Sequence, residues 1–150
     1  MLKTNPCHSH LNQEILMDNN YLTRDKLGMY TAEGEGPGPQ LMGADTLLGN
    51  DVCNAADEDL GDIKEFMIDM TSGKVAYAVL SYGGMLGMGD KLFAVPFTAL
   101  KLDTANKRFI LDVSKDAMKD APGFDKNSWP TMADDSWAKG VHSFYGTSQA

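Results

Sequence analysis

The strongest structural signal in the chain is GKVAYAVLSYGGMLGMGDKLFAVPFTAL, at residues 73–100. Within it, residues 74–82 and 90–96 are two apolar segments joined by a loop rich in glycine. The first segment has the valine and tyrosine bias of a strand, and alanines keep its opposite face nearly as apolar. Both faces are therefore expected to contact other parts of the protein. This stretch predicts a hairpin in the core.

The 150-residue chain is acidic, with 21 Asp and Glu against 13 Lys and Arg and a net charge of −8. Proteins that bind nucleic acid through its phosphates need clustered basic residues. Here the basic residues are scattered among acidic ones, so nucleic acid is not expected as a partner. The length suits one domain with arms, and a hydrophobic content of 43% can fill a modest core.

The chain has only two cysteines, Cys7 and Cys53. That is too few for a disulfide framework and is typical of a reducing compartment. The first residues lack the basic-then-apolar pattern of a signal peptide, and no apolar run approaches the roughly 18 residues of a membrane span. The sequence therefore predicts a cytoplasmic protein without direct membrane insertion.

Residues 1–40 are expected to form a flexible arm, because EGEGPGP near its end permits neither a continuous helix nor a sheet ladder. Cys7, His8 and His10 are residue types that bind zinc, but a structural zinc site needs four ligands at defined spacing. The remaining histidine, His142, lies at the far end of the chain. No metal site is predicted.

Short strands separated by turns are predicted for the rest of the domain at residues 41–115. Around Glu65 the apolar residues do not alternate cleanly, which predicts a bulge or bend in that strand. Residues 101–103 and 108–113 flank a polar turn and predict a second hairpin, and Ser114 is the expected cap of a short helix. With a turn about every ten residues, the pattern favours an all-β fold, a small barrel or sandwich, over alternating strands and helices.

The tail at residues 116–150 is rich in aromatic residues. Exposed aromatic side chains on this scale are a liability, and Asp134 or Asp135 can cap a helix over residues 136–145. We expect the tail to pack on the barrel or on a second chain. Four of its residues are candidate interface positions: Trp129, Trp137, Phe144 and Tyr145.

The residue types that carry chemistry occur without the patterns that catalysis needs. The glycines after Tyr82 lead into a strand, whereas phosphate-binding loops lead into a helix N-terminus. The acidic residues at 57–65 do not match a calcium loop. Cys53 has no histidine nearby in sequence, Ser81 lacks the strand-turn-helix setting of a nucleophile, and His142 is expected to pair with a local carboxylate. No catalytic, cofactor-binding or metal-binding residue is assigned.

The loop between the two core strands carries three apolar residues, Met85, Leu86 and Met88, close to Tyr82. Methionine adapts to irregular partner surfaces, and such a loop is unusually hydrophobic if it faces water. The loop therefore either plugs one end of the barrel or contacts a partner. All four residues are candidate interface positions.

The long run GDIKEFMIDMTSGKVAYAVLSYGGMLGMGDKLFAVPFTAL, followed by KRFILDV and APGFDKNSWPTMAD, resembles the PRC-barrel family. This family is named for the cytoplasmic domain of the photosynthetic reaction centre H subunit, and the chain is most similar to its stand-alone bacterial members. The resemblance covers residues 42–146. It implies a six-stranded β-barrel that serves as an interaction module, with no catalytic motif to carry over.

Two classes of function follow. The first is a non-enzymatic adaptor that binds a protein partner and self-associates as a homodimer or higher oligomer. The second is a ligand-binding or enzymatic barrel with a site near the aromatic tail, which buried titratable residues around a pocket would mark. The resemblance alone adds an accessory role in a photosynthetic or respiratory electron-transfer complex.

Overall fold

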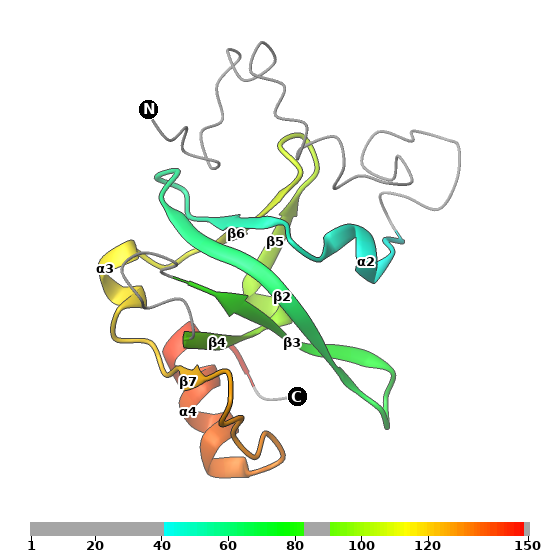
Figure 1. Ribbon diagram of the computed structural model, residues 1–150, viewed down its shortest axis with the longest axis vertical. Coiled ribbons are helices and arrows are strands. Elements are labelled where there is room, and N and C mark those ends of the chain that lie inside the picture. The colour runs from blue at the N-terminus through cyan, green and yellow to red at the C-terminus, as the bar shows by residue number, and fades with distance from the viewer. Residues whose placement is uncertain (1–40, 83–90, 149–150) are drawn as a thin grey trace.

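The structure is a computed structural model that describes residues 41–82 and 91–148. These residues form a seven-stranded sheet, which curves into a barrel with the strand order β5-β6-β1-β2-β3-β4-β7 (Figure 1). The strands are β1 (Asp51–Cys53), β2 (Asp59–Asp69), β3 (Lys74–Ser81), β4 (Lys91–Pro96), β5 (Leu100–Asp103), β6 (Arg108–Leu111) and β7 (Phe124–Asp125). The all-β prediction is confirmed. The sheet has one strand more than the resemblance implies, because the short β7 in the tail joins it by pairing with β4.

The central hairpin of β2 and β3 bends because its strands do not match residue for residue. The register shifts between Ile63 and Glu65 and again between Met67 and Ile68. Each bulge adds an unpaired residue, which increases the local twist and bends the strand. The bend predicted near Glu65 is confirmed, and it lets the 11-residue β2 follow the curve of the barrel.

The other strands complete the sheet on both sides of this hairpin. β1 runs antiparallel to β2 and parallel to β6, while β5 and β6 form the predicted second hairpin. Pro96 ends β4, and a single 3₁₀ turn, η2 (Phe97–Ala99), leads into β5. Proline lacks the N–H that a central strand needs at this point.

The interior of the barrel is filled by apolar side chains. Alternate residues of each strand point inward, and bulky side chains from several strands meet there with almost no exposed surface. A barrel of this size is wide enough only for its own side chains. The largest members of this core are Phe93, Phe109, Leu60, Ile63, Leu80 and Leu111.

In the described part of the chain, three short α-helices lie outside the sheet: α2 (Ala44–Leu47), α3 (Lys115–Met118) and α4 (Asp135–Tyr145). The Ser114 hydroxyl accepts a hydrogen bond from the Ala117 N–H at 3.1 Å, which is the cap that the sequence predicts. At α4 the carboxylate of Asp134 accepts from the Ser136 N–H at 2.9 Å. Within residues 41–82 and 91–148, no helix has the length and apolar character that crossing a membrane requires.

Helix α4 lies against the outer face of the sheet, next to β4 and β7 (Figure 1). Its Val141 is buried together with Tyr77 of β3 and Ala94 of β4, and Trp137 packs at the edge of this cluster. Because the cluster covers the outside of β3 and β4, both faces of the central strands are buried, as the apolar pattern of the core stretch predicts.

Candidate interaction surface

The described aromatic candidates are largely occupied by contacts within the chain. The Tyr82 ring packs edge-on against Phe93, with 6.0 Å between centroids. Trp137 packs against Tyr77 at 5.3 Å in the same manner. Both side chains are half-buried by these contacts, Tyr82 against the barrel core and Trp137 against the cluster around Tyr77.

Phe144 and Tyr145 lie at the end of α4 and contact each other, with ring centroids 4.8 Å apart. The Tyr145 hydroxyl points to the sulfur of Met118 at 4.0 Å. Burial raises the pKa of Tyr145, because an apolar environment disfavours the charged phenolate. Both rings pack against the barrel core.

Trp129 is the exception, since 44% of its surface is exposed. Its ring lies 5.0 Å from that of Phe124, and its Nε1–H donates to the Lys126 carbonyl at 2.9 Å. Met85, Leu86 and Met88 lie outside the described residues, as do Cys7, His8 and His10. In the part of the chain that is described, no three His, Cys, Asp or Glu side chains are grouped to hold a metal ion.

His142 contacts hydroxyl groups, and the prediction of a carboxylate partner was wrong. Its Nε2 lies 3.3 Å from the Tyr77 hydroxyl and its Nδ1 lies 2.7 Å from the Thr147 hydroxyl. A neutral imidazole can accept at one nitrogen and donate at the other. Because Tyr77 belongs to β3, the histidine ties the end of α4 to the barrel.

Cys53 is fully buried on β1. The chain's other cysteine, Cys7, lies outside the described residues. The reducing compartment inferred from the cysteine count stays a prediction.

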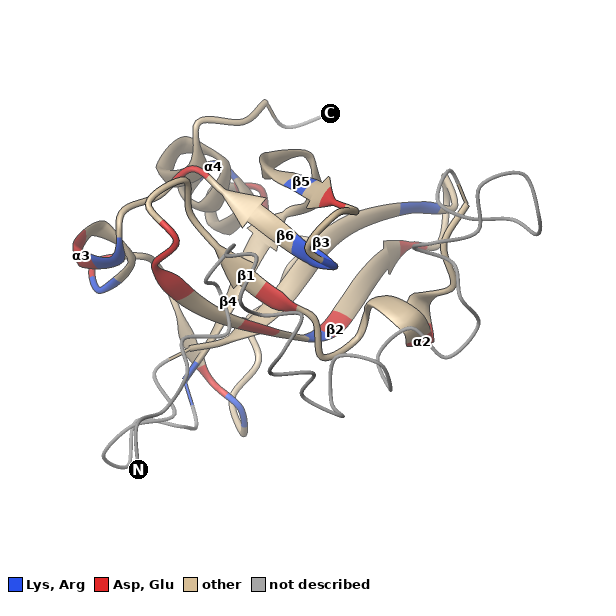
Figure 2. Cartoon of the chain, turned by 90° about the horizontal axis from the view of Figure 1, so that it is seen from above, with Lys and Arg blue, Asp and Glu red and all other residues tan. Residues whose placement is uncertain are grey.

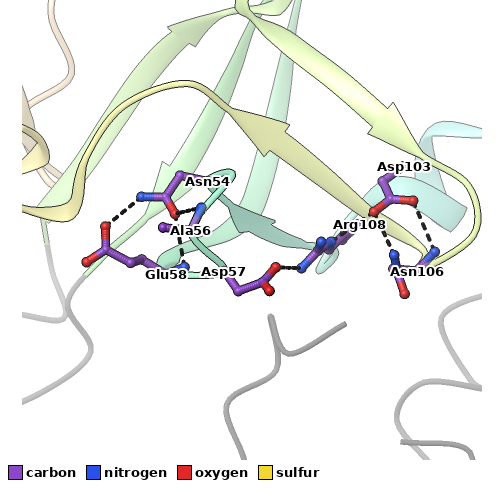
Figure 3. Close-up of polar contacts among 7 residues, drawn as sticks. All are labelled: Asn54, Ala56, Asp57, Glu58, Asp103, Asn106 and Arg108. Atoms are coloured by element: carbon purple, nitrogen blue, oxygen red, sulfur yellow. Dashed lines mark hydrogen bonds and ion pairs between the residues drawn. The ribbon is translucent and has the colours of Figure 1, made fainter. Parts of the chain in front are cut away.

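A polar network ties the β1–β2 turn to the β5–β6 hairpin (Figure 3). The buried Arg108 donates from Nε to Asp103 Oδ2 at 3.0 Å and from Nη1 to Asp57 Oδ1 at 3.1 Å. In the same turn the Asn54 side chain accepts from two backbone N–H groups and donates to Glu58 at 2.8 Å. These polar groups satisfy one another's hydrogen-bonding capacity between the β1–β2 turn and the β5–β6 hairpin, so we assign the network a structural role.

The network predicts how stability depends on pH. Burial acts to raise the pKa of Asp103, but hydrogen bonds from Asn106 and Arg108 outweigh it and hold that pKa below 3.8. A carboxylate with a lowered folded-state pKa stabilises the fold at higher pH, and this contribution is lost as pH falls through the lowered pKa. We expect Asp103→Asn to lower the melting temperature at neutral pH, with the difference from wild type shrinking below about pH 4.

Thermal melts monitored by circular dichroism between about pH 2.5 and pH 7 would measure this difference. Asp112→Asn is the matched control, because it removes the same charge at an exposed position outside the network. An equal loss of melting temperature in both variants across the whole range would contradict the structural role of Asp103.

The strongest exposed apolar feature among the described residues lies on the central hairpin, at positions that were not among the predicted interface residues. Ile68 is 49% exposed, and Met70, directly after β2, is 86% exposed. Ile68 follows Phe66 by two residues, so the two side chains project from the same face of β2. Phe66 is half-buried and contacts Phe97 at 6.1 Å. The row of β2 side chains that faces the barrel interior thus continues beyond the end of the barrel, where it is exposed to solvent.

This part of the hairpin consists of two strands alone within the described chain. Pairing with the β1 segment ends at Ile63, whose backbone bonds to Gly49 and Asn50, and pairing of β3 with β4 ends at Tyr77. Residues 64–76 therefore project as a β2–β3 ribbon, which Figure 1 shows extending away from the barrel. The β2 side of this ribbon is an edge that no described strand covers.

The tip of the ribbon is held in a defined turn. Asp69 accepts hydrogen bonds from the Thr71 N–H at 2.9 Å and from the Ser72 hydroxyl at 3.0 Å. The Thr71 N–H and the Ser72 hydroxyl lower the pKa of Asp69, so it remains charged at neutral pH. The ribbon is therefore a shaped projection with an apolar face.

Charge also distinguishes the ribbon from its surroundings. The preceding segment at residues 41–62 has six acidic residues and no Lys or Arg, and Figure 2 shows acidic positions along β1 and β2. In the ribbon, Lys64 and Lys74 balance Glu65 and Asp69.

The sequence alone contains a weak signal of this surface, namely apolar residues at 66, 68 and 70 that run directly into a turn.

A family model described as the PRC-barrel domain matches residues 39–118, more than half of the 150-residue chain. The match includes the entire β2–β3 ribbon and ends at α3. No curated protein matches the chain.

Proposed function

Because the chain belongs to the PRC-barrel domain family, we propose that it is a non-enzymatic protein-interaction module that binds through the β2–β3 ribbon. The observation that carries this proposal is the exposure of Ile68 and Met70 at an edge of the sheet that no strand of the described chain covers. An edge strand offers backbone N–H and C=O groups to an added strand. Neighbouring apolar side chains add affinity and specificity to such an addition.

The filled interior of the barrel supports binding on the outside. Phe93 and Phe109 occupy the space where a ligand-binding barrel would hold its ligand, and both are about 2% exposed. The buried Arg108 of β6 and the buried Asn54 of the β1–β2 turn are engaged with carboxylates and backbone groups. The arrangement favours an adaptor over a barrel with an internal site.

Affinity capture with the full chain as bait tests this function. We expect proteins bound by wild type to be enriched about tenfold or more over the double variant Ile68→Ser/Met70→Ser, since each replacement removes an exposed apolar contact. Leu41→Ser is the matched control, because Leu41 is 72% exposed but lies outside the ribbon. Quantitative mass spectrometry of the captured proteins would measure the enrichment.

The capture experiment can also contradict the proposal. If no protein depends on the ribbon, and native mass spectrometry finds the same small molecule on wild type and double variant, the chain is a ligand-binding barrel instead. Both variants should retain the wild-type melting temperature, because none of the three replaced side chains is buried.

A further inference from the structure

We propose that the ribbon pairs with the ribbon of a second copy of this chain, edge to edge along β2, to form a two-fold symmetric dimer. This inference rests on the proposed function and names the partner of the same surface. The edge runs over residues 64–69, a length of roughly 20 Å at about 3.3 Å per residue. That is comparable to an ordinary strand within a sheet.

One backbone donor on this edge is held by a side chain that a strand can replace. The Phe66 N–H donates to Oε1 of the adjacent Glu65 at 3.1 Å, and Glu65 is exposed. A backbone carbonyl of an added strand can replace the Glu65 carboxylate as the acceptor, since the displaced carboxylate is then hydrated by water. The Phe66 N–H is therefore satisfied in the monomer without being closed to pairing with a second strand.

The register that we propose for the dimer opposes the apolar side chains of the two copies. In antiparallel pairing about a two-fold axis, opposed residues lie on the same face of the sheet. An axis through Met67 places Phe66 opposite Ile68 of the second copy. The bulge at Lys64 and Glu65 counts as one position, so it comes opposite Asp69 of the second copy.

The charges in this register favour a second copy over another partner. Lys64 and Glu65 of each copy lie together opposite Asp69 of the other, so each rim of the apolar contact holds one ion pair, from Lys64, beside one opposing carboxylate, that of Glu65. The ribbon as a whole is neutral, whereas the chain has a net charge of −8. Two copies repel each other through most of their surface, and this repulsion is smallest where the ribbons meet. A basic peptide would instead be drawn to the acidic segment at residues 41–62.

A charge-swap experiment tests this register with the full chain. We expect Lys64→Glu to raise the dimer dissociation constant about tenfold or more, because it leaves only carboxylates at each rim. We expect Asp69→Lys to raise the constant less, because the new lysine faces Glu65 as well as Lys64. Mixing the two variants restores opposite charges at both positions, so we expect the mixture to form a heterodimer of near wild-type affinity. Sedimentation equilibrium over a dilution series would measure all three constants.

A second variant acts in the opposite direction. We expect Glu65→Ala to lower the dissociation constant several-fold, because it frees the Phe66 N–H and removes a negative charge opposite Asp69. Leu41→Ser should leave the constant unchanged. Asp69→Lys also removes the hydrogen bonds of the turn, so its melting temperature must be compared with that of Asp69→Asn, which keeps a side-chain acceptor without the charge.

Three outcomes would overturn the inference. One is a wild type that remains monomeric across the dilution series, and another is a dimer that is indifferent to both charge reversals. The third is a mixture that fails to associate although both variants are folded. In each case the capture experiment with Ile68→Ser/Met70→Ser still decides separately whether the ribbon binds a different protein, so failure of the dimer is distinguishable from failure of the module.

Discussion

Replacing Gly61 with alanine is expected to abolish or nearly abolish cooperative folding. Gly61 has a φ of +115°, which L-residues with a side chain rarely adopt. A Cβ atom at this position would overlap the carbonyl oxygen of Ser81 and lie 3.2 Å from the Cα of Tyr82. Both contacts are with backbone, so no side chain can rotate away. We expect a loss of at least about 4 kcal/mol in the free energy of unfolding, a large share of the total for a domain of this size.

The matched controls are glycines that have room for a methyl group. Gly73 has a φ of +77°, and no atom lies within 4 Å of the position that a Cβ would take, so alanine there is expected to cost only about 1–2 kcal/mol from backbone strain. Gly140 lies in α4 with equally open space and ordinary φ, so alanine is expected to stabilise by about 0.5–1 kcal/mol. Urea denaturation of the three variants would measure these changes. Similar losses for Gly61→Ala and Gly73→Ala would show that β2 does not approach β3 closely at Gly61.

Truncation of Phe93 is expected to have the next largest effect. The ring is about 2% exposed, contacts Tyr82 at 6.0 Å between centroids and has the Lys91 ammonium 5.3 Å from its centre. Phe93→Ala removes this contact and leaves a cavity in the barrel, which costs about 3–5 kcal/mol in well-packed cores. The same denaturation experiment would measure the loss.

The control for Phe93 is a smaller change in volume at the same place. Phe93→Leu keeps most of the apolar contact and is expected to cost about half as much or less. If Phe93→Ala lowers the free energy of unfolding by less than about 1 kcal/mol, the surrounding side chains must move into the space that the ring leaves. In that case the interior is not the rigid support from which the ribbon projects.

Much of the fold could be predicted from local pattern. The core strands, the second hairpin, the Ser114 cap and the bulge near Glu65 each follow from a few neighbouring residues, and the structure contains all of them. These features depend on steric and hydrogen-bonding preferences that act within one or two turns of the chain. β7 was not predicted, because two residues, Phe124 and Asp125, join the sheet only where the tail returns to β4.

The candidate surface was harder to predict, because exposure depends on distant strands. Trp137 and Tyr145 have the composition of an interface but pack on the barrel, since β3, β4 and α3 offer them apolar surface. Ile68 and Met70 have the composition of a core but are exposed, since β1 pairs with β2 only near its start. An apolar residue in a strand is buried only if a neighbouring element extends far enough to cover it. The length of that element depends on a different part of the sequence.

The order of the amino acids was enough to establish that this chain forms short, apolar strands with defined turns, and that it belongs with the PRC-barrel domains. Which of its apolar residues face water followed only from the assembled sheet. Strand propensity is a local property, whereas burial is a sum over contacts between segments far apart in sequence. The ribbon forms because β2 and β3 extend beyond the strands that pair with them. No residue within β2 or β3 indicates how long the neighbouring strands will be.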